Sequence, residues 1–364
     1  MRILLVRLRL IGDVVFTTPA IRAVRRRFPD GHVAYVVEPE AAPVVTGNRH
    51  LDDVIVARRG KGLAGLKADI ALVKRLRAAR YDLAIDFHGG PRSGLLTALC
   101  GARTRIGYAI PGRTWCYTQR VERSRDLRPR HSVVNQWDLL APLGIGAPDP
   151  SEDATEMPEQ ADAAGRVARW LEGVGYGGDP ALIVLHVSAG NPFRRWPVAA
   201  FTELVVRLLN ESPGRWVAVT SGPSDMQAAA RVCVDARGQV APDAARRILH
   251  ASDLGLADLR SLIGRAALFI GGDSGPMHIA GTTTTPIVAL YGPTLRQRSE
   301  PWRDPALVSE AVELRDLACR PCDQRECVTG DVRCLAAIPA RMVQEAAERA
   351  MARQQDRQGV EKST

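Results

Sequence analysis

The stretch ALFIGGDSGPMHIAGTTTTPIVALYGPT, residues 267–294, carries the clearest fold signal in the chain. An apolar strand at 267–270 precedes a Gly-Gly turn, a short helix with a polar start and a second apolar strand. Glycines let the backbone approach a ligand closely, and free N–H groups at a helix start attract anions. Asp273, Ser274 and His278 stand beside that turn. The stretch predicts either a phosphate-binding turn or a plain corner whose helix is capped by Asp273 or Ser274.

Length and composition indicate a soluble globular protein with two domains. The chain has 364 residues, of which 46% are hydrophobic and 24% are charged. No apolar run approaches the roughly 20 residues that span a bilayer. The first segment, MRILLVRLRLIGD, has charges within its apolar run and no small-residue cleavage site, so it reads as a strand and not as a signal peptide. A cytoplasmic location is therefore expected.

The positive charge is concentrated in the first part of the chain. Residues 1–150 hold 25 Lys and Arg against 13 Asp and Glu, whereas the remainder holds 24 against 27. This asymmetry favours contact of the first half with a polyanion, a negatively charged lipid surface or a phosphorylated substrate. The alternative is an arginine-rich coding bias without functional meaning.

The first half alternates short apolar strands with amphipathic helices. Strands are predicted at Arg2–Arg7, His32–Val37, Asp53–Val56 and Leu83–Phe87. A loop is predicted at Leu8–Asp13, and helices at 18–28, 66–80, 95–99 and 132–143. Repeated strand–helix units with short turns predict a parallel, doubly wound sheet.

The second half starts a new series of the same kind after a Pro- and Gly-rich connection at Gly146–Gly178. Strands are predicted at Ala181–Val187 and Trp216–Thr220, and helices at Val198–Asn210, Ala257–Arg265 and Pro339–Arg353. The polar tail from residue 354 is expected to be disordered. We therefore predict an α/β protein with domains at 1–160 and 175–340, followed by a C-terminal helix and tail at 341–364.

Four candidate sites fall where predicted strands end, the edge at which parallel sheets bind ligands. Asp13 follows the first strand and suits a general base, or else an ordinary cap. HVSAGNPFRRWP, residues 186–197, suits a diphosphate clamp because arginine pairs with phosphate oxygens, or else a solvated basic turn. TSGPSD ends at Asp225, which suits ribose hydroxyls or an ordinary turn. The stretch at 267–294 is the fourth.

Together these segments resemble glycosyltransferase family 9, the lipopolysaccharide core heptosyltransferases, and most of all the heptosyltransferase II type. The resemblance covers nearly the whole chain. It rests on RLRLIGDVVFTTPAIRAVRRRFP at 7–29, HVSAGNPFRRWP at 186–197, GGDSGPMHIAGTTTTPIVALYGPT at 271–294 and CRPCDQRECVTGDVRCLAAI at 319–338.

The resemblance implies a GT-B fold, with an acceptor domain and a nucleotide-sugar domain facing each other across a cleft. It implies metal-independent, inverting transfer of heptose from ADP-L-glycero-D-manno-heptose to Kdo-lipid A or heptosyl-Kdo-lipid A. No cofactor is expected, and nothing in the chain resembles a DxD-type metal site. The expected partners are the nucleotide sugar and an anionic lipopolysaccharide acceptor at the inner face of the inner membrane, with no nucleic acid. A monomer is expected.

The resemblance also assigns roles to residues. Asp13 would be the general base, and Arg194 would stabilise the leaving diphosphate where the family often has lysine, with Arg195 as the alternative occupant. The other donor-side residues by resemblance are Ser188 on the phosphates, Asp225 near the ribose where the family commonly has Glu, Leu254 against the adenine, and Asp273, Ser274, Gly275 and His278 around the diphosphate and sugar. The candidates for binding the anionic acceptor are Arg58, Arg59, Lys61, Arg92, Arg120 and Arg123.

Four of the seven cysteines cluster as Cys319, Cys322, Cys327 and Cys334. Because cytoplasmic disulfides are rare, metal ligation or reduced thiols are the two interpretations. The other three, Cys100, Cys116 and Cys233, are predicted to be small buried hydrophobes.

Three alternatives to a heptosyltransferase remain at this point. The run GDSGP mimics a serine-protease nucleophile motif, but strand–helix alternation argues against the all-β barrel that this needs. A family-9 transferase using another nucleotide sugar is the second alternative. A nucleotide-sugar-binding protein without activity is the third, and the presence of Asp13 argues against it.

Overall fold

The computed structural model describes residues 1–123, 130–178, 181–188, 191–251, 253–320, 322 and 326–361. The chain divides into two compact units. Unit 1 comprises Met1–Pro158 with Trp302–Asp304, and unit 2 comprises Glu159–Pro301 with Pro305–Thr364. No described helix is long and apolar enough to cross a membrane.

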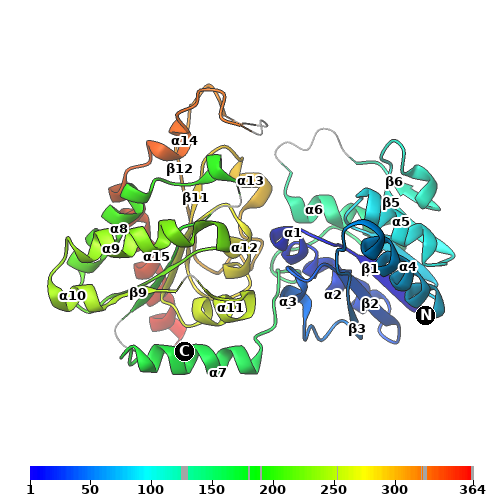
Figure 1. Ribbon diagram of the computed structural model, residues 1–364, viewed down its shortest axis with the longest axis horizontal. Coiled ribbons are helices and arrows are strands. Elements are labelled where there is room, and N and C mark those ends of the chain that lie inside the picture. The colour runs from blue at the N-terminus through cyan, green and yellow to red at the C-terminus, as the bar shows by residue number, and fades with distance from the viewer. Residues whose placement is uncertain are drawn as a thin grey trace. The chain divides into compact units, whose positions relative to one another are not determined.

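Unit 1 is built on one parallel sheet with helices on both faces (Figure 1). Within the described residues the strand order is β3-β2-β1-β4-β5-β6. The strands are β1 Arg2–Val6, β2 His32–Val37, β3 Asp53–Val56, β4 Leu83–Asp86, β5 Thr104–Tyr108 and β6 Gln119–Val121. The helices are α1 Ile11–Val15, α2 Thr18–Arg27, α3 Ala42–Val45, α4 Gly62–Ala78, α5 Pro91–Leu99, η1 Thr114–Cys116, α6 Ser132–Trp137 and η2 Asp138–Leu143.

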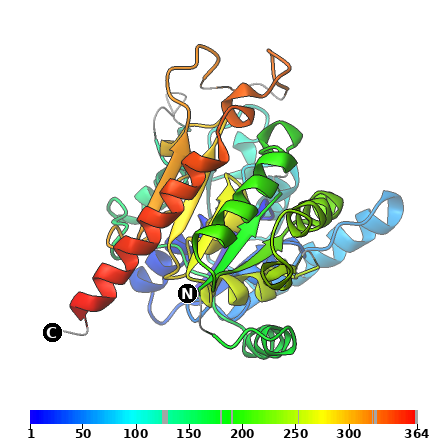
Figure 2. The ribbon, with the colours of Figure 1, turned by 90° about the vertical axis from the view of Figure 1, so that its left-hand side faces the viewer.

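Unit 2 repeats this architecture with the strand order β12-β11-β10-β7-β8-β9 in its described part. The strands are β7 Leu182–His186, β8 Trp216–Thr220, β9 Ile248–His250, β10 Leu268–Gly272, β11 Ile287–Tyr291 and β12 Ser309–Glu313. The helices are α7 Ala161–Gly173, η3 Pro192–Arg194, α8 Val198–Glu211, η4 Pro223–Asp225, α9 Met226–Arg237, α10 Pro242–Arg246, α11 Leu256–Gly264, α12 Gly275–Ala280, α13 Arg296–Ser299, α14 Arg333–Ala336 and α15 Ala340–Glu361. Figure 2 shows α15 (red) beside α8 (green).

The central strands are apolar throughout because helices cover both faces of each sheet. Ile3, Leu4, Leu5 and Val6 of β1 are fully buried, as is the start of β10. Each unit has its own hydrophobic core on this pattern. The predicted α/β class with two parallel sheets is confirmed.

Several predicted boundaries are wrong. The predicted loop at Leu8–Asp13 contains the start of α1, so Asp13 lies in the first turn of a helix. Gly271 and Gly272 are the last residues of β10 and not a turn. A Cβ on Gly271 would lie 2.9 Å from the ring of Phe269, so close packing explains this glycine.

Two predicted helices also differ from the structure. The helix predicted at 132–143 splits into α6 and the 3-10 helix η2, which contains Pro142. The tail predicted to be disordered is instead helical as far as Glu361: residues 354–358 (QQDRQ) contain no helix breaker, and α15 continues through Gly359. The last three residues of that tail lie outside the described part.

A short segment far along the chain belongs to unit 1, which the sequence did not indicate. The backbone N–H of Thr155 donates to the Trp302 carbonyl at 3.0 Å, and the Trp302 indole donates to the Asp153 carbonyl at 2.9 Å. The Trp302 ring also lies 4.8 Å from the His131 ring. Trp302 is thus anchored among residues of unit 1.

Candidate active-site residues

Asp13 lies beside the carboxyl end of β1, where its carboxylate is held by two donors. The Arg7 Nη2 donates to Asp13 Oδ2 at 2.7 Å, and the Leu10 N–H donates to the same oxygen at 3.2 Å. Arg7 is itself fixed, because its Nη1 donates to the Phe87 carbonyl at 2.5 Å. The Asp13 side chain is 37% exposed, so it is positioned by the protein and still accessible.

The backbone of the Asp13 turn is also restrained. Thr17 Oγ1 donates to the Asp13 carbonyl at 2.8 Å, and Gln136 Nε2 donates to it at 3.2 Å. The Thr17 hydroxyl and Gln136 Oε1 are also within hydrogen-bond distance of each other, at 2.5 Å. A carboxylate on such a supported turn can accept a proton at a fixed point.

His88 is a further candidate near Asp13 that sequence reasoning missed. Its Nδ1 lies 3.1 Å from the Arg9 carbonyl, and burial, followed by the positive charge of Arg7, lowers its pKa. It is held by Asp86, which accepts from the backbone N–H groups of His88 and Gly89. The available signal was a histidine at the end of a predicted strand followed by two glycines.

Asp86 is a buried structural carboxylate. Its Oδ2 accepts from the Tyr117 hydroxyl at 2.7 Å and from the Ser93 hydroxyl at 2.9 Å. Burial raises the pKa of Asp86, although these hydrogen bonds oppose that shift. Asp86 therefore organises the turn after β4.

Two of the basic residues proposed for the acceptor already have acidic partners. Arg92 contacts Glu38 at 3.0 Å and Asp69 at 2.7 Å, and Arg59 contacts the same Glu38 at 2.9 Å. Arg120 donates to the Thr114 carbonyl at 3.1 Å. For Arg58 and Lys61 the described residues provide no side-chain partner, and Arg123 stacks over a tyrosine ring.

In unit 2, Ser188 and Asp225 come together after β7 and β8. The Ser188 hydroxyl donates to Asp225 Oδ2 at 2.5 Å, and Ser224 donates to the same oxygen at 2.8 Å. Arg195 Nε contacts Asp225 Oδ1 at 2.9 Å. The Asp225 side chain is only 3% exposed, so its carboxylate is engaged by protein donors.

Arg194, Asp273 and His278 form a second group. Arg194 Nη1 lies 3.8 Å from Asp273 Oδ2, and His278 Nε2 lies 3.7 Å from Asp273 Oδ1. Thr294, which sequence reasoning did not single out, donates its hydroxyl to Asp273 Oδ2 at 2.6 Å. Three of the predicted donor-side residues therefore meet around one carboxylate.

The helix start after β10 offers fewer amide groups than its sequence suggests. Ser274 is the N-cap of α12, but its hydroxyl donates to the Gly272 carbonyl and makes no capping bond. Pro276 has no N–H, and the amides of Met277 and His278 donate to the Ser274 carbonyl. Within the described part of the chain no acceptor is bonded to the amides of Ser274 and Gly275, so these two are available for a ligand. Leu254 lies in the loop between β9 and α11, half-buried.

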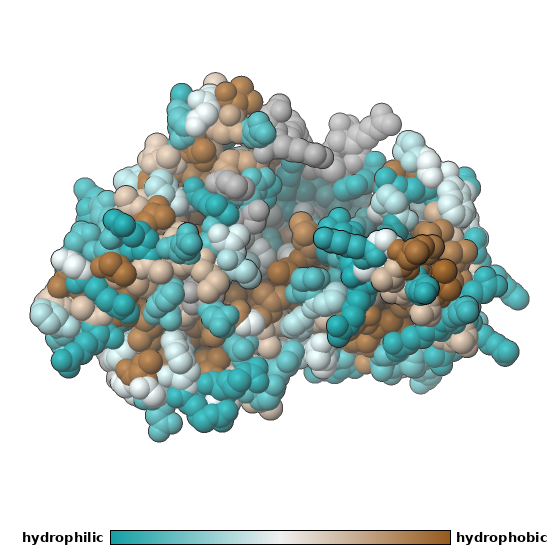
Figure 3. All heavy atoms as spheres, in the orientation of Figure 1, coloured by the Kyte–Doolittle hydropathy of each residue, from teal (hydrophilic) through white to brown (hydrophobic). Residues whose placement is uncertain are grey.

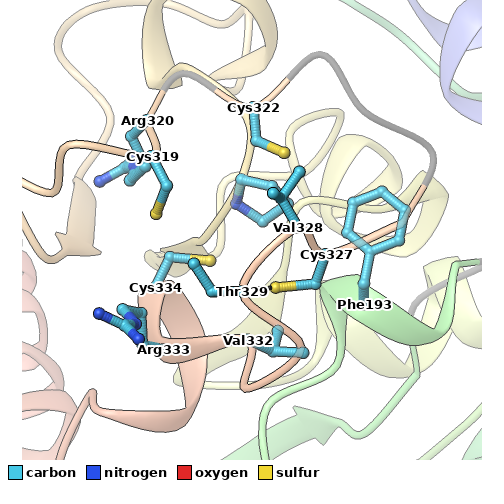
Figure 4. A pocket seen from close by; sticks show the side chains of 11 residues that line it. Phe193, Cys319, Arg320, Cys322, Cys327, Val328, Thr329, Val332, Arg333 and Cys334 are labelled. Atoms are coloured by element: carbon cyan, nitrogen blue, oxygen red, sulfur yellow. Dashed lines mark hydrogen bonds between the residues drawn. The ribbon is translucent and has the colours of Figure 1, made fainter.

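The four clustered cysteines line one cavity of about 340 Å³ (Figure 4). All seven cysteines are free thiols. Among the described residues, no group of three or more His, Cys, Asp or Glu side chains is arranged to hold a metal ion. Cys100, Cys116 and Cys233 are buried as predicted.

The cysteine segment also supports the loop that carries Thr294. The Cys322 N–H donates to the Pro293 carbonyl at 3.0 Å, and Arg320 Nη2 donates to the Thr294 carbonyl at 3.2 Å. Arg320 is in turn paired with Glu313 at 2.8 Å. The segment therefore lies next to the group around Asp273.

A profile of glycosyltransferase family 9 (heptosyltransferase) matches residues 70–332, well over half of the chain. The chain belongs to glycosyltransferase family 9. It is thus a glycosyltransferase, and the resemblance to family 9 seen in the sequence is confirmed.

Relatives and solved structures of the family extend over almost the whole chain. Lipopolysaccharide heptosyltransferase 3 of Escherichia coli is 28% identical over 324 residues, which are 88% of this chain and 91% of that protein. A family 9 glycosyltransferase from Veillonella parvula superposes with a TM-score of 0.83 at 22% identity, covering 96% of this chain and 97% of that one. The E. coli ADP-heptose LPS heptosyltransferase II gives 0.76 at 18% identity, covering 98% and 100%. The GT-B fold follows. Heptosyltransferases of types 1, 2 and 3 all match the chain, so no single type is identified.

The profile match covers the donor-side residues but begins after Asp13. Asp13 is therefore supported by its geometry and by the longer resemblance, while its chemical role stays a prediction. The same holds for the roles of Arg194, Ser188, Asp225 and Leu254, and for those of the residues after β10.

Proposed function

We propose that this family 9 chain transfers heptose from ADP-L-glycero-D-manno-heptose to the inner core of lipopolysaccharide, with Kdo-lipid A or heptosyl-Kdo-lipid A as acceptor. Family membership supports heptosyl transfer. The donor and acceptor classes are supported by the names of the relatives, which include a lipopolysaccharide heptosyltransferase and an ADP-heptose LPS heptosyltransferase.

The observation that carries the proposal is the Asp13 carboxylate, held at 2.7 Å by Arg7 and still 37% exposed. In the proposed reaction Asp13 takes the proton from the attacking acceptor hydroxyl, whose oxygen then bonds to the anomeric carbon. The bond between that carbon and the ADP oxygen breaks, and ADP departs with the electron pair. One base and one displacement invert the anomeric configuration.

On the donor side we assign the developing diphosphate charge to Arg194. Its guanidinium lies at the edge of the group formed with Asp273 and His278, and no described residue accepts a hydrogen bond from its buried Nε. A cation placed where negative charge develops stabilises the transition state. The proposed reaction uses no metal and no cofactor, and Ser188 and the amides of Ser274 and Gly275 would complete the contacts with phosphate.

On the acceptor side, basic residues of unit 1 would bind the carboxylates and phosphates of the inner core. Arg58 and Lys61 are the strongest candidates, because Arg59 and Arg92 are paired with Glu38. We further propose that the enzyme works as a monomer in the cytoplasm, in peripheral contact with the inner face of the inner membrane.

The test is a donor panel with purified protein and a Kdo-lipid A acceptor. ADP-heptose should be consumed with release of ADP, while UDP- and GDP-sugars should give turnover at least a hundredfold lower. The product should have the anomeric configuration opposite to that of the donor, by NMR. Turnover with a UDP- or GDP-sugar that exceeds turnover with ADP-heptose would refute the proposed donor. Retained configuration would refute the single displacement.

A further inference from the structure

Helix α4 has an apolar stripe that unit 1 does not bury. Leu63, Leu66 and Ile70 are 77%, 58% and 47% exposed. Residues three and four apart lie on one side of a helix, so the three side chains form one stripe. The opposite side of α4 already supplies the core through Leu72 and the fully buried Leu76. The exposed stripe is therefore additional to what the fold requires.

The charges around this stripe are of one sign. Residues 58–80 contain eight Lys and Arg and a single acid, Asp69. Asp69 is paired with Arg92 at 2.7 Å, on the side of α4 that meets the rest of unit 1. Lys67 and Lys74 are exposed, one turn after Leu63 and Ile70 respectively, and no described acid pairs with either. The outward surface of α4 thus combines apolar and cationic side chains.

Neighbouring elements extend the apolar area. Helix α5 packs against both α4 and η1. Leu95 and Leu99, one turn apart on α5, are 46% and 37% exposed, and Trp115 of η1 is 62% exposed. Figure 3 shows hydrophobic side chains gathered over α4 and α5 with hydrophilic ones at their border. Exposed apolar side chains gathered on neighbouring elements in this way are typical of interaction surfaces.

We propose that this surface, formed by Leu63, Leu66, Ile70, Leu95, Leu99 and Trp115 and called the α4 patch, docks on an anionic lipid bilayer. Helices with one apolar face and flanking lysines lie in the headgroup region, and their lysine stems reach outward from the apolar boundary. Exposed tryptophan is enriched at the same depth. The docking deepens the proposed function, because a lipid-linked acceptor is presented at a membrane surface.

Charge selects the bilayer over a second copy of the chain. A symmetric dimer through the α4 patch would place Lys67 and Lys74 near the same residues of the other copy, with no unpaired acid of α4 to offset them. An anionic bilayer supplies the complementary charge and attracts each lysine independently. The absence of acid on the outward side of α4 therefore favours the lipid surface.

The test is flotation of the full chain with vesicles of phosphatidylglycerol and phosphatidylethanolamine, compared with phosphatidylcholine. We expect binding to the anionic vesicles and at least tenfold weaker partition to phosphatidylcholine or at 0.5 M salt. The variant Leu63→Ser/Leu66→Ser/Ile70→Ser should lower partition by about a hundredfold. Val234→Ser on α9, a position that is 64% exposed, is the matched control and should bind like the parent chain.

A second variant, Lys67→Gln/Lys74→Gln, should lower partition by about tenfold and flatten its salt dependence. It also carries the test if circular dichroism shows that the triple variant does not fold. Unchanged binding by both variants, or equal binding to phosphatidylcholine, would overturn the proposal. So would a parent chain that sediments as a dimer and a triple variant that sediments as a monomer.

Activity separates this inference from the proposed reaction. On a water-soluble acceptor without acyl chains the triple variant should keep its turnover, while on a vesicle-embedded acceptor it should lose at least tenfold. If the parent chain bound anionic vesicles through the α4 patch yet consumed no ADP-heptose on any acceptor, the proposed reaction would fail and the docking would stand.

Discussion

The variant Asp13→Asn separates the proposed chemistry of Asp13 from its structural contribution. Asparagine keeps the shape of the side chain and an oxygen that accepts from the Leu10 N–H, but it removes the charge that pairs with Arg7. A general base contributes about 10²- to 10⁴-fold to rate, equivalent to about 3–5 kcal/mol in the barrier. We expect kcat to fall by about a thousandfold.

The structural cost of the same variant is much smaller. A hydrogen bond to a charged group contributes about 1.5–3 kcal/mol, but the Asp13 side chain is 37% exposed and solvent screens part of this. We therefore expect a loss of about 1 kcal/mol in the free energy of unfolding. In a unit of this size that lowers Tm by about 2–4 °C.

Asp52→Asn is a matched control in the same unit. Asp52 Oδ2 accepts from Arg25 Nη2 at 2.5 Å and from the Val33 N–H at 2.7 Å, and its side chain is 41% exposed. It therefore has the same kinds of partner as Asp13, but it lies at the amino end of its strand. Asp52→Asn should cost similar stability and leave kcat within about twofold.

The assays are ADP release under saturating donor, thermal unfolding, and binding of ADP-heptose by calorimetry. Donor affinity should change by less than about threefold in Asp13→Asn, because the predicted donor-side residues are in unit 2. A variant that retained more than a third of parental kcat would refute the assignment of the base. So would an equal loss of kcat in both variants.

Three further predictions concern unit 2. Arg194→Ala should lower kcat by about a hundredfold with little change in Tm, and Arg194→Lys should restore part of the lost kcat. Arg195→Ala should mainly lower Tm, because it leaves the buried Asp225 without its cation. Steady-state kinetics together with thermal unfolding distinguish the two arginines. Burial lowers the pKa of His186 to about 4 from its ordinary 6.5, so the unfolded chain binds the proton at a higher pH than the folded chain does. The free energy of unfolding should therefore fall by up to about 3 kcal/mol as pH falls from 6.5 to 4. Urea unfolding of the parent chain and of His186→Gln, which should lack this fall, separates the effect of His186 from that of other groups. The Thr329 hydroxyl lowers the pKa of Cys327, so iodoacetamide at pH 7.5 should label Cys327 faster than any buried thiol, and Thr329→Ala should slow that labelling as followed by mass spectrometry.

Most inner strands of both sheets and the edge strand β3 could be predicted from the sequence, whereas β5 and the edge strands β6, β9 and β12 could not. β1 and β10 are continuous apolar runs because helices cover both faces. β6 and β12 read QRV and SEAVE, and their side chains are mostly polar and partly exposed. An edge strand has one neighbour and needs less apolar surface, so its sequence differs little from that of a loop.

The candidate residues at strand ends could also be predicted, but their partners could not. Asp273 follows an apolar strand directly, and Asp13 follows one after a short segment; both positions are signals in the local sequence. Arg7 and Thr294 hold these two carboxylates, yet nothing in the local sequence gives the distance of Arg7 from Asp13 or of Thr294 from Asp273. Such pairs arise only when the chain has folded.

The adjacent residues Arg194 and Arg195 differ in the contacts that they make in the folded chain. Both Arg194 and Arg195 were candidates for the diphosphate from the sequence, since either places a guanidinium after β7. Arg195 contacts Asp225, a carboxylate only 3% exposed, at 2.9 Å. Moving Arg195 to a ligand would remove the cation that compensates this buried charge and leave Asp225 with the hydroxyl donors of Ser188 and Ser224.

Arg194 makes no comparably close contact with a carboxylate among the described residues. Arg194 lies 3.8 Å from Asp273, and its side chain is 38% exposed. The Asp273 carboxylate also contacts Thr294 through Oδ2 and His278 through Oδ1. Turning toward a diphosphate therefore costs Arg194 a long, partly solvated contact with Asp273 and its position over the Phe193 ring, 5.9 Å from the ring centre, and Asp273 keeps its other partners. Because a group that stabilises a leaving anion must be able to approach it without disrupting the fold, the geometry favours Arg194 for the chemistry and Arg195 for the support of Asp225.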